Sequence, residues 1–133
     1  MDAWDGWVFA RLYMLLVALA FAVIGAQVFL FHWRAAFHRW TMYGPVLAAP
    51  VIVAAGVVGA IKRDGWLGWL VLAVFALGIA EGMVGIFEHF RGIARRIGGL
   101  SLRNLMSGPP PLLPVAFMAL ALTGALALVW RAF

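Results

Sequence analysis

The segment from Trp66 to Phe87, WLGWLVLAVFALGIAEGMVGIF, decides the fold of this chain. Glu81 is its one charged side chain, and the segment has no period-two alternation of the kind that strands of a membrane barrel show. An α-helix needs roughly 20 predominantly apolar residues to cross the hydrocarbon core of a bilayer. Because unpaired backbone amides are not tolerated in lipid, we predict that this segment is a transmembrane helix.

Three further segments have the same character. They run from about Trp7 to Phe31, from Met42 to Ile61 and from Leu112 to Trp130. The composition agrees, since 66% of the residues are hydrophobic and only 11% are charged, whereas a soluble domain carries about a quarter of charged residues. We therefore predict an all-α integral membrane protein in which residues 1–133 form one compact up-down bundle of four transmembrane helices.

The tryptophans and the connections support these boundaries. All seven tryptophans fall at the predicted helix ends, where the headgroup layer favours an amphipathic ring: Trp4, Trp7, Trp33, Trp40, Trp66, Trp69 and Trp130. The polar turn at residues 62–65 predicts a hairpin of the second and third helices. We expect the basic connections, residues 32–41 (loop 1) and 89–111 (loop 3), to lie in the interface. A short interfacial helix is predicted from Leu100 to Met106.

The distribution of charge predicts an orientation. The residues before the first helix include Asp2 and Asp5 and no basic residue, so we expect this helix to be retained rather than cleaved as a signal peptide. Loops 1 and 3 share one side of the membrane and hold six of the ten lysines and arginines. The positive-inside rule then places these loops in the cytoplasm and both termini outside, and the expected location is a bacterial cytoplasmic membrane.

The composition also excludes several classes of function. The chain has no cysteine, which rules out disulfides, iron–sulfur clusters and thiolate zinc sites. Its net charge of +5 resides beside the apolar segments, where it meets anionic lipid, so we do not expect nucleic-acid binding. The arginines of loop 3 are expected to contact lipid headgroups or the acidic surface of a partner: Arg91, Arg95, Arg96 and Arg103.

The third helix carries a stripe of small and polar residues on one face. Steps of one or three residues separate its members, which are Gly78, Glu81, Gly82, Gly85, Glu88 and His89. Gly78 and Gly82 form a small-xxx-small pair, which lets another helix approach closely. We predict that this stripe contacts protein, because Glu81 would cost several kcal/mol or more if it faced lipid.

Glu81 itself has two interpretations. In the first it is a proton or ion site, or an anchor for a partner, because ionisable groups inside a membrane are usually functional. In the second it is a neutral carboxyl group that forms a hydrogen bond across the bundle. Gln27, the amide in the first helix, is the candidate partner, since it lies at a comparable depth.

Three histidines fall on the side of loops 1 and 3, at His32, His38 and His89. Two imidazoles on facing helices can bind a b-type haem axially, with arginines pairing with its propionates. The first and third helices run in the same direction, so His32 and His89 are the expected haem ligands. Two alternatives stay open: a divalent metal held by histidine together with Glu88, or interfacial histidines without any cofactor. No CxxCH, HExxH or ExxH motif is present.

These observations leave two classes of function. The sequence contains no catalytic triad and no phosphate-binding loop, so we do not predict an enzyme. The favoured class is a small non-catalytic subunit of a larger membrane complex, in contact with other membrane subunits and anionic lipid and able to hold a b-type haem. The alternative is a homo-oligomeric proton-coupled transporter or channel that uses Glu81. The subunit is favoured because a conduction pathway needs several polar sites inside the membrane.

Overall fold

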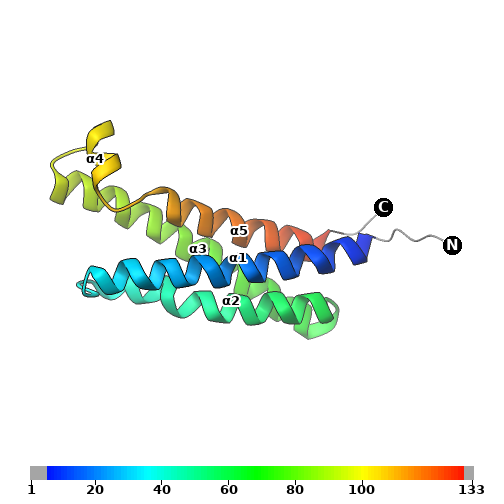
Figure 1. The fold of residues 1–133 in the computed structure, drawn as a ribbon. Coiled ribbons are helices and arrows are strands. Elements are labelled where there is room, and N and C mark those ends of the chain that lie inside the picture. Colours follow the sequence, from blue (N-terminus) through cyan, green and yellow to red (C-terminus); the bar gives the residue numbers. More distant parts are fainter. Residues whose placement is uncertain (1–5, 131–133) are drawn as a thin grey trace.

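The computed structural model describes residues 6–130, and most of them are helical (Figure 1). Four long helices form the body of the molecule: α1 (Gly6–Arg34), α2 (Tyr43–Ile61), α3 (Gly65–Gly92) and α5 (Leu112–Val129). Each is long and apolar enough to cross a membrane. The prediction of an all-α membrane bundle with four spanning helices is confirmed.

Two helices extend beyond their predicted ends. α1 continues from Phe31 to Arg34 and α3 from Phe87 to Gly92, and both therefore include polar and basic residues in their last turns. A helix pairs its own backbone groups in lipid and in the headgroup layer alike, so polarity alone does not end it. Basic side chains are also favourable near the negative end of the helix dipole.

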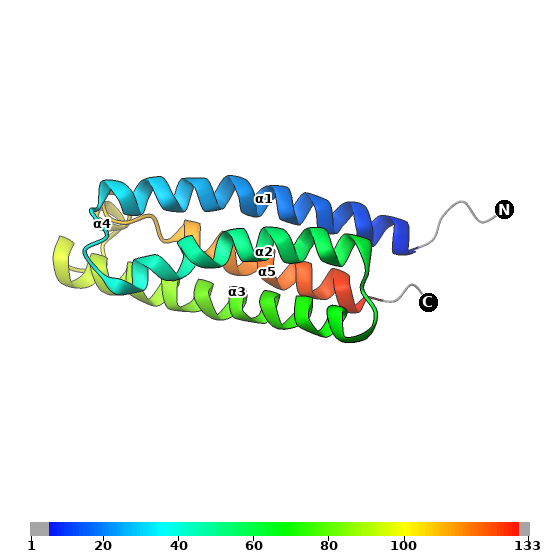
Figure 2. The same cartoon turned by 90° about the horizontal axis from the view of Figure 1, so that it is seen from below.

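The helices alternate in direction, and each packs against its two neighbours around the bundle (Figures 1 and 2). The packed pairs are α1 with α2, α2 with α3, α3 with α5 and α5 with α1. Residues 62–64 connect α2 to α3, in agreement with the predicted hairpin. It follows that α1 and α3 run parallel on a diagonal of the bundle.

The glycines of the stripe on α3 face α5. A Cβ atom on Gly82 would lie 2.8 Å from the backbone nitrogen of Met118, and one on Gly85 would lie 2.7 Å from Cβ of Pro114. A Cβ atom on Gly78 would lie 3.1 Å from Cβ of Ala121. The absence of a side chain at these three glycines therefore lets α3 and α5 approach closely, which favours van der Waals packing of helices in lipid.

Large side chains fill the centre of the bundle. Phe21, Phe75 and Phe117 are fully buried and come from α1, α3 and α5. The rings of Phe21 and Phe117 meet edge to face with their centroids 4.9 Å apart. Met14 and Ile52 are buried in the same cluster. This part of the bundle is thus closed by packed side chains.

Loop 3 contains two short helical segments that lead away from the bundle. A π-helical turn, η2 (Ile93–Ile97), continues α3, and α4 (Leu102–Ser107) follows it. Gly98 and Gly99 separate them with φ angles of +105° and +113°, which glycine adopts without strain. The Ser101 hydroxyl accepts a hydrogen bond from the Asn104 amide and caps α4. The helix predicted at residues 100–106 is therefore present.

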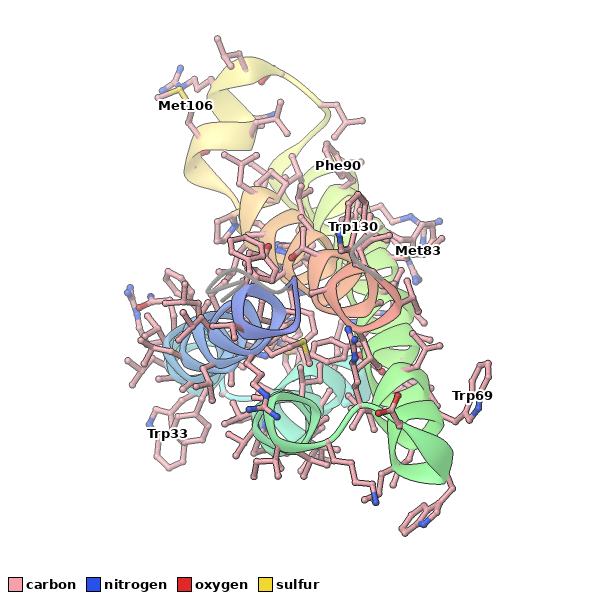
Figure 3. The ribbon with its side chains drawn as sticks, turned by 90° about the vertical axis from the view of Figure 1, so that its right-hand side faces the viewer. Trp33, Trp69, Met83, Phe90, Met106 and Trp130 are labelled. Atoms are coloured by element: carbon pink, nitrogen blue, oxygen red, sulfur yellow. The ribbon has the colours of Figure 1, made fainter. Side chains whose placement is uncertain are left out.

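The tryptophan side chains that the structure describes are exposed at the two ends of the bundle. Trp33 and Trp40 lie at the end where α1 finishes, and the opposite end carries a second group, Trp66, Trp69 and Trp130. Seen along the bundle, Trp33 and Trp69 project away from the helices (Figure 3). Trp4 and the side chain of Trp7 lie outside the described part of the chain.

Candidate ligand-binding site

A cavity of about 540 Å³ lies at the end of the bundle where α1 and α3 finish. Its walls come from the last turns of α1, loop 1, the 3₁₀ turn η1 (Trp40–Met42), the first turn of α2, the C-terminal half of α3, η2 and the proline-rich segment before α5. Apolar side chains such as Phe31, Met42, Leu113 and Phe117 form much of the wall.

Polar side chains predicted from the sequence meet in this cavity. Those that line it include His32, His38, His89, Glu81, Glu88, Arg34, Arg39 and Arg96. Gly82 and Gly85 also belong to the lining, whereas Gly78 lies deeper in the bundle against Ile52. Arg95 and Arg103 are exposed on loop 3. The structure thus assembles most of the stripe and all three histidines in one place.

His38 has both ring nitrogens engaged. The chain reverses before it through Ala36 and Phe37, which have φ angles of +55° and +44°. Nδ1 of His38 lies 3.0 Å from the Ala35 carbonyl oxygen, and Nε2 contacts Nη1 of Arg96. A carbonyl only accepts and a guanidinium only donates, so Nδ1 carries the proton and Nε2 accepts from Arg96. His38 is therefore occupied as a structural contact between loop 1 and η2.

His89 has one ring nitrogen engaged. Its Nδ1 donates to the Pro110 carbonyl oxygen at 2.8 Å. Extended proline-rich segments have no internal hydrogen bonds, so their carbonyls are available to such a donor. The contact fixes the orientation of the ring and its tautomer, and it leaves Nε2 unprotonated.

His32 is the third histidine of the cavity. Its Nδ1 atom is buried and has no hydrogen-bond partner among the described residues, although the ring lies beside the main chain of Met42. His32 is also near enough to His89 for a charge on one ring to act on the other. The ring contacts Phe37 at a tilted angle, with centroids 6.1 Å apart. A buried ring nitrogen without a partner costs about 1–3 kcal/mol, so the fold leaves part of the hydrogen-bonding capacity of His32 unsatisfied.

Glu81 occupies the deeper part of the lining. Its carboxyl group lies against Gly44 in the first turn of α2, at a point where any larger residue would collide with Oε2. The hypothesis that Gln27 pairs with Glu81 is wrong, because Gln27 is exposed on the outside of α1 and does not line the cavity. α1 and α3 are diagonal in the bundle, so an equal depth does not bring these two side chains together.

Glu88 lies between two arginines. Its carboxylate oxygens are 3.5 Å from Nη2 of Arg39 and 3.4 Å from Nη1 of Arg91. The Glu88 side chain is 18% exposed and each arginine 34%, so solvent weakens both pairs. Glu88 is thereby committed to a contact between loop 1 and α3. Among residues 6–130, no group of three or more histidine and carboxylate side chains is arranged to hold a metal ion.

Sequence reasoning missed the partners that organise the site. No pattern in the sequence marks Gly44 and Pro110 as neighbours of the predicted residues, or Arg96 as the partner of His38.

Comparison of the chain with models of protein families, with curated proteins and with solved structures finds no match.

Proposed function

We propose that this chain is a small, non-catalytic subunit of a larger membrane complex and that its functional element is the cavity between the ends of α1 and α3. One observation supports ligand binding above all. Polar groups line the cavity near the headgroup layer, whereas its deeper wall is formed by Phe117, which is buried and packed against Phe21. Because the cavity ends against packed aromatic rings, it suits the binding of a molecule better than the passage of an ion or substrate through the bundle.

The size and lining of the cavity agree with this proposal. Small-molecule sites measure roughly 300–1,000 Å³, are mostly apolar and carry a few polar groups that orient the ligand. The cavity of about 540 Å³ lies within that range. Helical bundles build such sites from side chains on facing helices. His32 on α1 and His89 on α3 are placed in this way.

The outer segments support a role within a complex. Among the described elements, α4 packs mainly against η2 and extends away from the four long helices (Figures 1 and 3). It exposes Leu102 and Met106, and the neighbouring Leu100 is exposed as well. Arg95 and Arg103 are exposed on the same loop. An apolar and basic segment outside the bundle suits the headgroup layer or the surface of another subunit.

The alternative, a homo-oligomeric proton-coupled transporter or channel, is favoured by one observation. Glu81 lines the cavity and is only half-buried, so protons can reach it from the side of loops 1 and 3. Transport would need a second route from Glu81 to the other side of the membrane, through the packed core or between copies of the chain.

The test is purification of the tagged full chain from its native membrane in a mild detergent, followed by proton-flux measurements in proteoliposomes. We expect other membrane proteins to co-purify in fixed proportion, and we expect no proton flux above that of empty vesicles. Glu81→Gln should assemble with the same companions. Purification as a homo-oligomer, with a proton flux that Glu81→Gln removes, would instead establish the alternative.

A further inference from the structure

We infer that the cavity binds a b-type haem, with His32 and His89 as the two axial ligands of the iron. This inference rests on the proposed ligand-binding role of the cavity and names the cofactor that the cavity would take. It requires two ring nitrogens that can bind iron, a space between them for a flat macrocycle, and cations for the propionates.

The hydrogen bonds select two of the three histidines. His38 cannot serve, because Ala35 and Arg96 engage both of its ring nitrogens. Nε2 of His89 has no partner in the described part of the chain. Nδ1 of His32 is buried, so Nε2 is the nitrogen that His32 would present to the iron, and it forms no hydrogen bond with another described side chain. The two rings with an uncommitted nitrogen are thus the pair expected from the directions of the helices. The hydrogen bonds of the fold therefore select the same pair, His32 and His89, that the helix directions predict.

His89 has the environment of a metal-binding histidine. Such residues almost always donate their other ring N–H to a carbonyl or carboxylate, which fixes the tautomer and makes the coordinating nitrogen more basic. The hydrogen bond of 2.8 Å from Nδ1 of His89 to the Pro110 carbonyl has this form.

The bundle provides space between the two rings. α1 and α3 lie on a diagonal of the bundle (Figure 2), and residues from the last turns of both helices line the cavity. Gly82, Gly85 and Gly92 of α3 also belong to the lining. The apolar residues Phe31, Met42 and Leu113 would contact the faces and edges of a porphyrin. Two axial ligands are sufficient for haem iron, so the lack of a three-ligand cluster in residues 6–130 is consistent with this cofactor.

The charges of the lining suit two carboxylates. The lining contains three arginines, Arg34, Arg39 and Arg96, and two carboxyl groups, those of Glu81 and Glu88. Arg39 and Arg96 are held in place by Glu88 and His38. Arginine forms bidentate hydrogen bonds with carboxylates, and these side chains lie at the headgroup level, where haem propionates reach water.

The first experiment measures haem binding by the full chain. The protein is purified from haem-replete cells, and the apoprotein is titrated with haemin in detergent. We expect one haem per chain, a Soret band and the low-spin spectrum of bis-histidine ligation. His32→Ala and His89→Ala should each abolish that spectrum, whereas the control Gln27→Ala, at an exposed position of α1 outside the cavity, should keep it.

A second variant separates ligation from folding. His89→Met keeps a potential axial ligand, so we expect haem binding with the altered spectrum of histidine–methionine ligation, while far-ultraviolet circular dichroism shows unchanged helix content. The inference is overturned if the folded wild type binds no haemin, or if folded His32→Ala or His89→Ala keeps the bis-histidine spectrum of the wild type. A folded chain that rejects haemin but retains a quinone or lipid would overturn the haem assignment and leave the ligand-binding role standing.

Discussion

Replacement of Gly82 by a larger residue tests the packing that positions the cavity. Gly82 lies where α3 and α5 approach most closely along the stripe, next to the backbone of Met118. A Cβ atom there would lie 2.5 Å from Cβ and 2.8 Å from the backbone nitrogen of Met118, whereas ordinary contacts begin at 3.4 Å. The added methyl group is therefore too close by about 0.9 and 0.6 Å.

The distances indicate the size of the effect. The backbone of Met118 belongs to α5 and cannot rotate away as a flexible side chain would, so the two helices must separate by a large part of 1 Å. Overpacking of this kind typically costs about 1–3 kcal/mol. We expect Gly82→Ala to lose stability within that range and Gly82→Leu to lose more, because its three additional carbon atoms meet the same helix.

The assay is unfolding of the purified protein in mixed micelles of increasing SDS content, followed by circular dichroism. Ala80→Leu is the matched control, since Ala80 lies on the same helix and is exposed. Surface substitutions away from packed contacts usually change stability by less than about 0.5 kcal/mol. If Gly82→Leu unfolds at the same SDS content as the control and the wild type, α3 and α5 do not pack through the glycine face and our account of the bundle is wrong.

Three further predictions address the orientation and the polar contacts. Reporter fusions at Phe133 and between Gly98 and Gly99 should show the C-terminus outside and loop 3 in the cytoplasm; cytoplasmic activity at Phe133 would reverse the orientation. Gly44→Ala should cost less than the roughly 1–3 kcal/mol of core overpacking, because its methyl group meets only the flexible end of the Glu81 side chain, which can move into the cavity. Glu81→Ala in the same chain should remove that cost, and an unchanged cost in the double variant would contradict the contact. Arg39→Ala should cost no more than about 1 kcal/mol, because its pair with Glu88 is partly exposed, and the cost should shrink in high salt.

The sequence was sufficient to predict the bundle because a bilayer imposes few solutions on a long apolar segment. Helix number, direction and the α2–α3 hairpin follow from the lengths of the apolar segments and their connections. Hydropathy predicts the C-terminal ends of α1 and α3 at Phe31 and Phe87, because it falls where the first polar residues appear. The helices end later, at Arg34 and Gly92. Hydrogen bonding within a helix continues past that point, and the extra turns carry His32 and His89 into the cavity wall.

The arrangement of helices around the bundle could not be read from the sequence, and the pairing of Glu81 with Gln27 failed for that reason. Depth in the membrane follows from position along a helix, whereas contact requires knowledge of which helices are adjacent. α3 lies next to α2 and α5, so Glu81 meets Gly44 of α2 while Gln27 remains exposed on α1. A glycine opposite a carboxylate leaves no periodic pattern, because it contributes only the space that the larger side chain fills.

The three histidines show what tertiary contacts add to the candidate residues that the sequence provides. In the sequence, His32, His38 and His89 share a side of the membrane and have arginines nearby, and only the helix directions favour one pair. Their availability to a ligand is set by acceptors and donors that the fold supplies. Arg96, which is 58 residues from His38 in the sequence, donates to Nε2 of His38. The carbonyl oxygen of Pro110, 21 residues from His89, accepts from Nδ1 of His89 and fixes the orientation of that ring. These contacts separate a histidine that holds loop 1 against η2 from one whose Nε2 forms no hydrogen bond in the described part of the chain, and that difference is the reason why His89, and not His38, is proposed as a haem ligand.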